Sequence, residues 1–273
     1  MPAIADLLTS GRRGTPVRRL LLRGLERARL LRPAFRGYER LQALRATDGD
    51  GAADLPPARL RVRVAGTADA AWFLEGGCLA AETVRTTAAR HGHPLGEVGA
   101  LLDFGCGCGR VLRHWRDLPA RVHGSDADGE AVEWCRRHLP FAQVTANAGK
   151  PPLPHAGESF ELVYAFSVLT HLPEELGRAW LAELGRVLRP GGLLLVSTHG
   201  ERYLDRLAAA ERERFAAGEV VVRWEQAAGT NLCAAYHPRA AVERAAPGLA
   251  FVEHVPEGAL GNPHQDLYVL RRD

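Results

Sequence analysis

Residues 101–109 read Leu-Leu-Asp-Phe-Gly-Cys-Gly-Cys-Gly, so an apolar run ends at Asp103 and glycines follow at alternate positions. The next residues, 110–116, have the apolar and charged pattern of an amphipathic helix. A strand, a glycine turn and a helix in this order are typical of a binding site for a nucleotide-type cofactor. Glycine suits such a turn because it adopts positive φ and lets a ligand contact bare backbone.

A second acidic residue supports this interpretation. Residues 120–126, Ala-Arg-Val-His-Gly-Ser-Asp, predict another short strand that ends in an acid. Asp126 lies 21 positions after Gly105, close to the spacing of about 20 at which such folds place a carboxylate on ribose hydroxyls. The alternative is that Asp126 only caps a helix over residues 128–138, since Asp is a favoured N-cap. We expect ribose binding, because the order of strand, acid and helix repeats at the right interval.

Four motifs, in order, resemble those of class I S-adenosylmethionine-dependent methyltransferases, and the resemblance covers about residues 70–273. Residues 103–109 resemble the first motif of that family, and residues 125–128, Ser-Asp-Ala-Asp, resemble the second. Residues 159–172 resemble its fourth strand and the loop that follows. Residues 184–197 resemble the helix, the Pro-Gly-Gly turn and the fifth strand.

The resemblance implies an α/β fold: a Rossmann-like, seven-stranded methyltransferase sheet with helices on both faces and the last strand antiparallel. The alternation of strands and helices over residues 99–198 favours a parallel sheet by itself. We divide the chain into a basic helical N-terminal arm with a linker, residues 1–58, and an S-adenosylmethionine-binding domain, residues 59–273. An insertion after the fifth strand, residues 199–240, is expected on the substrate side.

Other segments complete the predicted order of elements. Residues 59–64, Arg-Leu-Arg-Val-Arg-Val, alternate as in a strand, and residues 69–91 predict a helix. Within the insertion we expect a charged helix over residues 204–217. Residues 249–254 and 266–271 predict a terminal pair of strands, which agrees with the antiparallel last strand of the family.

The family's cofactor site, carried over residue by residue, involves the glycine turn and the two acids. The resemblance implies that the backbone of Gly105 and Gly107 approaches the methionine part and the ribose of S-adenosylmethionine. Asp103 then orients the turn near the amino group of the cofactor. Asp126 holds the ribose hydroxyls, and Ala127 lies beside the adenine.

Four further residues are assigned to the cofactor by the same resemblance. Asn147 stands where the family often has Asp, and its side-chain oxygen can accept a hydrogen bond from the adenine amino group; the alternative is an asparagine that only forms a turn. Ala165 and Phe166, at the end of the fourth strand, are expected to offer a carbonyl and packing near the methionine. Phe73 resembles part of the segment that closes over the cofactor, or belongs only to the core.

Two histidines are the candidate catalytic residues. Methyl transfer is a direct displacement, in which the protein mainly aligns the reactants and activates the nucleophile. A histidine suits that activation, because its ordinary pKa lies near neutrality. His171 and His199 follow the fourth and fifth strands, on the edge where open α/β sheets bind ligands. A purely structural role remains the alternative for each.

Composition restricts the remaining classes of protein. No apolar run is long enough for a membrane span and no signal sequence opens the chain, so we expect a cytoplasmic protein without a membrane partner. The five cysteines are scattered and odd in number, which favours reduced thiols. Cys106 and Cys108 lack a second pair at zinc-like spacing, so we expect small residues of the turn there and no metal site.

The N-terminal arm carries most of the positive charge. Residues 1–45 contain eleven arginines and three acids, whereas the whole chain has a net charge of +3. Such a segment can bind nucleic acid or an anionic surface. However, Leu20, Leu21 and Leu25 fall near helical spacing, so we favour a helix that packs on the domain or across a homodimer over nucleic-acid binding.

The composition of the insertion indicates which class of molecule accepts the methyl group. It carries apolar and aromatic residues that suit a small organic molecule, among them Phe215, Val221, Trp224, Leu232 and Tyr236. Residues 165–168 read Ala-Phe-Ser-Val, without the Asn-Pro-Pro-Tyr-like motif of many nucleic-acid amino methyltransferases. We therefore expect methylation of a small molecule, on oxygen and in secondary metabolism. The alternatives are an RNA or protein methyltransferase that docks through the basic arm, and a cyclase or binding protein on the same fold.

Overall fold

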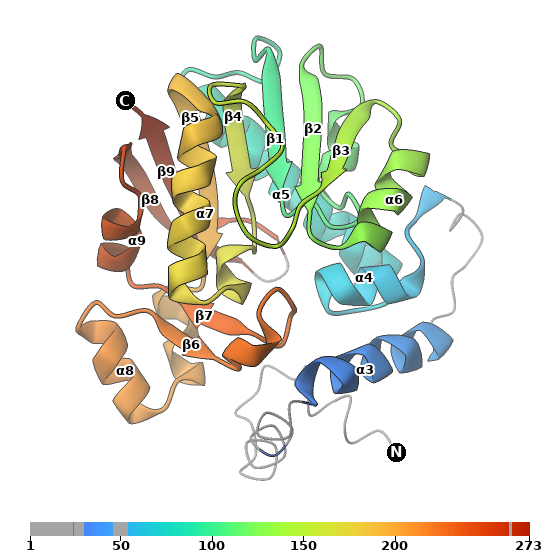
Figure 1. Cartoon of the computed structure of the whole chain (residues 1–273), viewed down its shortest axis with the longest axis vertical. Helices are drawn as coiled ribbons and strands as arrows, with labels where there is room; N and C mark the ends of the chain where they lie inside the picture. The colour runs from blue at the N-terminus through green and yellow to red at the C-terminus, as the bar shows by residue number, and fades with distance from the viewer. Residues whose placement is uncertain (1–23, 25–29, 46–53, 262–263) are drawn as a thin grey trace.

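The computed structural model describes residues 24, 30–45, 54–261 and 264–273 of the chain (Figure 1). Most of the basic arm and of its linker therefore lies outside the described residues. The described part of the arm is α3 (Leu31–Arg45), which packs on α4 (Ala58–Ala65).

The core is a seven-stranded sheet of order β3-β2-β1-β4-β5-β9-β8. Neighbouring strands from β3 to β5 run parallel, and β9 is antiparallel to both β5 and β8. This confirms the predicted sheet, including its antiparallel last strand. The strands are β1 (Ala100–Phe104), β2 (Arg121–Asp126), β3 (Ala142–Ala146), β4 (Phe160–Ala165), β5 (Leu188–Thr198), β8 (Leu249–Ala259) and β9 (Gln265–Arg272).

Helices cover both faces of the sheet, and the alternation of side chains along each strand explains why. Leu101 and Leu162 belong to one apolar cluster, whereas their neighbours Leu102 and Val163 belong to another, as the two-residue period of a strand requires. The first cluster packs under α5 (Ala70–Arg90) and α6 (Gly129–His138), and the second packs under α7 (Glu174–Val187) and α9 (Arg239–Ala245). Both faces are apolar because both are buried.

The glycine turn follows β1 and places three glycines in the left-handed region, with φ of 77° at Gly105, 53° at Gly107 and 78° at Gly109. The amphipathic helix predicted over residues 110–116 is wrong. Only a short 3-10 helix, η2 (Leu112–Trp115), forms there. Its two ends, Leu112 and Trp115, are buried three positions apart, which matches the three-residue turn of a 3-10 helix.

The strand predicted over residues 59–64 is also wrong, because these residues form the helix α4. The alternating pattern misleads here because Arg61 is buried as deeply as its apolar neighbours. Its guanidinium donates to the carbonyl oxygens of Pro56 at 2.7 Å and Ala68 at 2.9 Å, which satisfies the charge inside the protein. Gly66, with φ of 74°, ends the helix.

The insertion at residues 199–240 folds as several short pieces beside the carboxyl ends of β4 and β5 (Figure 1). The helix predicted over residues 204–217 is interrupted, since an extended backbone at Leu207 separates its two parts. These pieces are η4 (Glu201–Arg206), α8 (Ala209–Ala216), β6 (Val221–Arg223), η5 (Glu225–Ala227) and β7 (Ala234–Tyr236). β7 reaches the main sheet through a bridge between His199 and Tyr236.

Within the described residues, no helix combines the length and apolar character that crossing a bilayer demands. In the same part of the chain, no three His, Cys, Asp or Glu side chains are grouped to hold a metal ion.

We expect Gly109→Ala to lower the free energy of unfolding by about 1–3 kcal/mol, because it strains a left-handed backbone position. An added Cβ would also collide with Leu139. Urea denaturation measures the change. Gly129→Ala is the matched control, since no atom lies within 4 Å of its Cβ position and its φ is ordinary. Equal stability of Gly109→Ala and the wild type would contradict the proposed strain.

Candidate functional site

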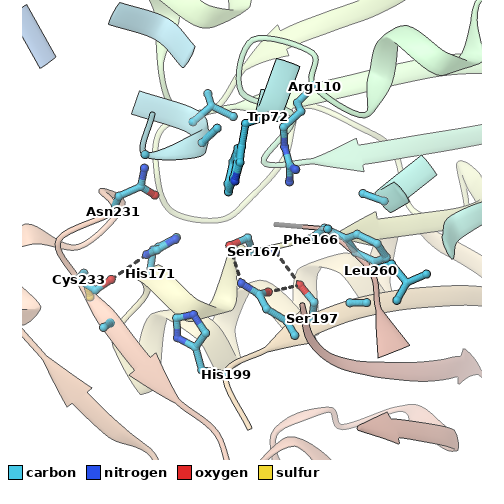
Figure 2. Close-up of a pocket in the computed structure, with 18 of the residues that line it drawn as sticks. Trp72, Arg110, Phe166, Ser167, His171, Ser197, His199, Asn231, Cys233 and Leu260 are labelled. Atoms are coloured by element: carbon cyan, nitrogen blue, oxygen red, sulfur yellow. Dashed lines mark hydrogen bonds between the residues drawn. The ribbon is translucent and has the colours of Figure 1, made fainter. Parts of the chain in front are cut away.

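Two adjoining cavities lie at the carboxyl ends of the parallel strands. The large cavity, of about 1030 Å³, is lined by the residues that follow β1, β2 and β3. The small cavity, of about 220 Å³, lies between α5, the loop after β4 and the insertion (Figure 2). Six residues line both cavities and mark their junction: Val64, Arg110, Phe166, Ser167, His171 and Asn231.

Asp103, the last residue but one of β1, lines the large cavity and has an unsatisfied oxygen. Its side chain is buried, and Oδ2 has no hydrogen-bond partner among the described residues. Burial raises the pKa of Asp103 to about 7, against the opposing hydrogen bond from the Tyr164 hydroxyl. Trp115 Nε1 donates to that hydroxyl at 2.7 Å and so fixes it. A cationic group in the cavity would satisfy Oδ2 and return the carboxyl to its charged form.

Asp126 ties the glycine turn to the end of β2. Its Oδ2 accepts from the Gly107 amide at 2.7 Å, and its Oδ1 accepts from the Asp128 amide at 2.8 Å. The N-cap of α6 is Asp128, whose Oδ1 accepts from the Glu130 amide at 3.0 Å, and not Asp126. Each carboxylate oxygen of Asp126 keeps a second lone pair, so the residue can still accept from two hydroxyl groups in the cavity.

Ala127 and Asn147 line the large cavity beside Asp126. Asn147 also forms a turn: its Oδ1 accepts from the Gly149 amide at 2.8 Å, and its Nδ2 donates to Ser125 Oγ at 3.1 Å. Asn147 can form this turn and still accept a hydrogen bond from a ligand in the cavity, because its amide oxygen retains one free lone pair.

At the end of β4, Phe166 lines both cavities as expected. Two other predicted residues do not reach them. Ala165 is fully buried in the cluster under α7, and Phe73 is fully buried in the cluster under α5. The Phe73 ring packs in the core, which favours the alternative that the residue is only structural, and its neighbour Trp72 faces the small cavity (Figure 2).

The His171 side chain has a defined tautomer. Its Nδ1 lies 2.7 Å from the carbonyl oxygen of Cys233 (Figure 2). Because a carbonyl only accepts hydrogen bonds, Nδ1 carries the proton and Nε2 presents a lone pair. Burial lowers the pKa of His171 from 6.5, although the bond to Cys233 opposes the shift. Near pH 7 the ring is therefore neutral, with a basic nitrogen at the junction of the cavities.

His199 lies deeper in the small cavity, with its ring 6.4 Å from that of His171 between centroids. Burial holds the pKa of His199 well below 6.5, and the charges of His171 and Arg206 lower it further. Its Nδ1 is buried and has no hydrogen-bond partner among the residues that the structure describes. The ring is packed between Tyr203 and Tyr236, at centroid distances of 4.3 and 5.4 Å. These contacts indicate that His199 is a fixed, neutral side chain in the wall of the cavity and not a group that gains and loses protons.

A polar network that the sequence reasoning missed supports the floor of the small cavity. Gln265 Nε2 donates to Ser167 Oγ at 2.9 Å, and Ser197 Oγ donates to Gln265 Oε1 at 2.7 Å (Figure 2). The Ser167 amide in turn donates to Ser197 Oγ at 2.7 Å. These bonds hold Ser167 at a φ of 59°, which is rare for a residue other than glycine.

Comparison with known proteins agrees with this geometry. Residues 102–196 match the family model described as "Methyltransferase domain". A ubiquinone biosynthesis O-methyltransferase of Sinorhizobium fredii is 31% identical over 45% of this chain and 48% of its own length. A malonyl-[acyl-carrier protein] O-methyltransferase of Yersinia pestis is 32% identical over 44% and 46%, respectively. The matched stretch thus spans about half the length of these relatives.

A solved structure shares the fold. A putative sarcosine dimethylglycine methyltransferase from Galdieria sulphuraria superposes with a TM-score of 0.52 at 10% identity, over 71% of this chain and 84% of that one. Family model, relatives and fold together identify a class I S-adenosylmethionine-dependent methyltransferase domain in this chain. The cofactor of such a domain is S-adenosylmethionine.

The residues of the large cavity fit that cofactor. The unsatisfied Oδ2 of Asp103 suits an ammonium group, and the free lone pairs of Asp126 suit the two hydroxyls of a ribose. The glycine turn lines the cavity with Gly105 and Gly107, and it has no room for side chains there, because a Cβ at either position would collide with Val168 or Val64.

We expect the affinity for S-adenosylhomocysteine to fall roughly tenfold between pH 8 and pH 6, because the ligand's ammonium binds the ionised form of Asp103. Because the pKa of Asp103 is about 7, the midpoint of this change in affinity lies near neutral pH. Calorimetric titration at several pH values measures it. In Asp103→Asn the affinity should be weaker and its pH dependence flatter, whereas ionisation of the ligand itself acts equally on both proteins. An identical pH profile for the two proteins would contradict the role of Asp103.

Proposed function

We propose that the chain transfers the methyl group of S-adenosylmethionine to an oxygen atom of a small organic molecule. The observation that carries this proposal is the position of His171, a neutral histidine with a fixed tautomer where the two cavities meet. The family assignment makes methyl transfer the chemistry of the domain, and the relatives that it resembles are named O-methyltransferases.

The large cavity is the proposed cofactor site. Asp103 receives the ammonium group of the cofactor, and Asp126 receives the ribose hydroxyls. The backbone of Gly105 and Gly107 lies against the methionine and ribose parts. Ala127 and Asn147 lie beside the adenine, and Phe166 packs at the methionine end, next to the small cavity.

His171 is the proposed general base. S-adenosylmethionine, when bound, supplies a methyl carbon on a sulfonium sulfur, and the sulfur keeps the electron pair of the broken C–S bond. His171 Nε2 takes the proton from the acceptor hydroxyl as its oxygen forms the new O–C bond. The Cys233 carbonyl holds the ring in place and stabilises the charged form that results. We assign His199 to positioning, since its ring is packed between two tyrosines.

The small cavity is the proposed acceptor site. Its volume of about 220 Å³ suits a compact molecule, and Trp72 and Phe166 offer flat apolar surface for an aromatic or unsaturated acceptor (Figure 2). Parts of the insertion at residues 199–240 form one wall, which supports its predicted place on the substrate side. The names of the relatives do not indicate secondary metabolism.

Methyl-labelled cofactor tests the proposed class of acceptor. The purified protein is incubated with the label and, in separate reactions, with a set of small phenols and hydroxy acids, with total RNA and with an extract of cellular proteins. Label in a small molecule, as an alkali-stable ether or an alkali-labile ester, supports the proposal. Label in RNA or protein contradicts it and favours docking through the basic arm.

We expect His171→Ala to lower kcat by roughly 10²- to 10⁴-fold, the contribution of a positioned base, with unchanged affinity for S-adenosylhomocysteine. In the wild type, kcat should fall toward acid pH with a midpoint below 6.5, because protonation removes the lone pair of Nε2. The variant should lose this acid limb. His138→Ala, an exposed histidine on α6, is the matched control. If kcat of the His171→Ala variant still falls toward acid pH as in the wild type, His171 has only a structural role.

A further inference from the structure

The charged side chains on the wall of the small cavity are all positive. Among its described lining residues there are two arginines, Arg110 and Arg206, and no Asp or Glu. The two histidines of the wall are neutral near pH 7, since burial lowers the pKa of each. The small cavity therefore presents two guanidinium groups to the acceptor.

Two acids near Arg206 are engaged elsewhere. Glu211 pairs with Arg223, with Arg223 Nε donating to Oε1 at 2.8 Å. Asp266 lies 2.8 Å from His254 Nε2 and accepts from the Glu257 amide at 3.1 Å. In the part of the chain that the structure describes, neither Arg110 nor Arg206 forms an ion pair.

The bound cofactor would satisfy only one of the two arginines. S-adenosylmethionine carries one carboxylate, one ammonium group and the sulfonium. Arg110 lines both cavities and lies close enough to Asp103 to affect its pKa, so it is placed to meet the carboxylate of the methionine part. Arg206 lines only the small cavity. With the cofactor present, Arg206 and the sulfonium remain as positive charges without an anion.

Ring contacts place Arg206 at the end of the small cavity that is away from the junction. Its guanidinium lies over the Tyr203 ring, 4.6 Å from the centroid. Tyr203 contacts His199, and His199 lies between Tyr203 and His171 in this series of rings. Arg223 Nη1 donates to the Arg206 carbonyl at 2.8 Å and anchors its backbone to β6.

We propose that the methyl acceptor is a small anion whose carboxylate binds Arg206, while its hydroxyl lies at His171 at the opposite end of the small cavity. This assignment rests on the proposed function, because it names the class of acceptor for the same site. A carboxylate at Arg206 would neutralise a half-buried charge through a charge-assisted hydrogen bond. It would also orient the acceptor, with its hydroxyl toward the methyl donor and its anion away from it.

Binding of a matched pair of probes tests the proposal without methyl transfer. The protein saturated with S-adenosylhomocysteine is titrated with 4-hydroxybenzoate and with 4-hydroxybenzamide, which have the same ring and hydroxyl and differ in charge. We expect the wild type to bind the acid at least about tenfold more tightly than the amide, the scale of one charge-assisted contact. Arg206→Gln should lose most of that preference and bind the amide as the wild type does.

Arg202→Gln is the matched control, because Arg202 lies on the same 3-10 helix, is exposed and pairs with Glu257 at 3.0 Å. It should keep the preference for the acid. Affinity for S-adenosylhomocysteine and the Tm show whether each variant is folded. Equal binding of the two probes by the wild type, binding of neither, or an intact preference in Arg206→Gln would overturn the proposal.

The two proposals fail in different ways. A protein that prefers the acid but methylates no small molecule keeps the anion site and contradicts the proposed function. A protein that methylates neutral phenols and shows no preference for the acid keeps the function and loses the anion site.

Discussion

The hydrogen bonds between the glycine turn and the end of β2 are the constraint on which the site depends. The Ser125 carbonyl accepts from the amides of Gly105, at 2.7 Å, and Cys106, at 3.2 Å, and Asp126 Oδ2 accepts from the Gly107 amide. These bonds require a left-handed turn, which only glycine adopts without strain. They bring the ends of β1 and β2 together, so that Asp103 and Asp126 face one cavity. They also place Arg110 at the edge of that cavity. A longer helix at residues 110–116 would have directed Arg110 elsewhere.

Most of the residues that the sequence assigns to the cofactor line one cavity, because they lie close together at strand ends. Asp103, Gly105, Gly107 and Asp126 lie at strand ends whose order is visible in the sequence, and the parallel sheet brings such ends together. The errors are local too. Residues 59–64 resemble a strand because nothing in the sequence shows that Arg61 is buried with its charge satisfied by two carbonyls. The sequence also does not show the rotation of α5, which buries Phe73 and points its neighbour Trp72 at the small cavity.

The acceptor half is not visible in the sequence, because its parts lie far apart in the chain. Ser167, Ser197 and Gln265 come from the ends of β4, β5 and β9, and only the sheet order makes them one network. The left-handed backbone of Ser167 also has no sequence signal, since the residue type does not favour it. Arg110 does have a signal, as it follows the last glycine of the turn directly. Arg206 has no such signal. The helix breaks at Leu207, which the residue pattern does not reveal, and this break sets the direction of Arg206.

The insertion links the two proposed functions of the small cavity, because it both orients the base and supplies the cation. The Cys233 carbonyl fixes the tautomer of His171, and the Gly229 amide donates to the His171 carbonyl at 2.8 Å, so the loop after β4 and the insertion hold each other. The same insertion carries Arg206. A displacement of the insertion would therefore release the histidine ring and move the arginine at once. We infer that base strength and acceptor selection are coupled in this protein: a change that repacks residues 229–233 should alter both, whereas a change at Asp103 should alter neither.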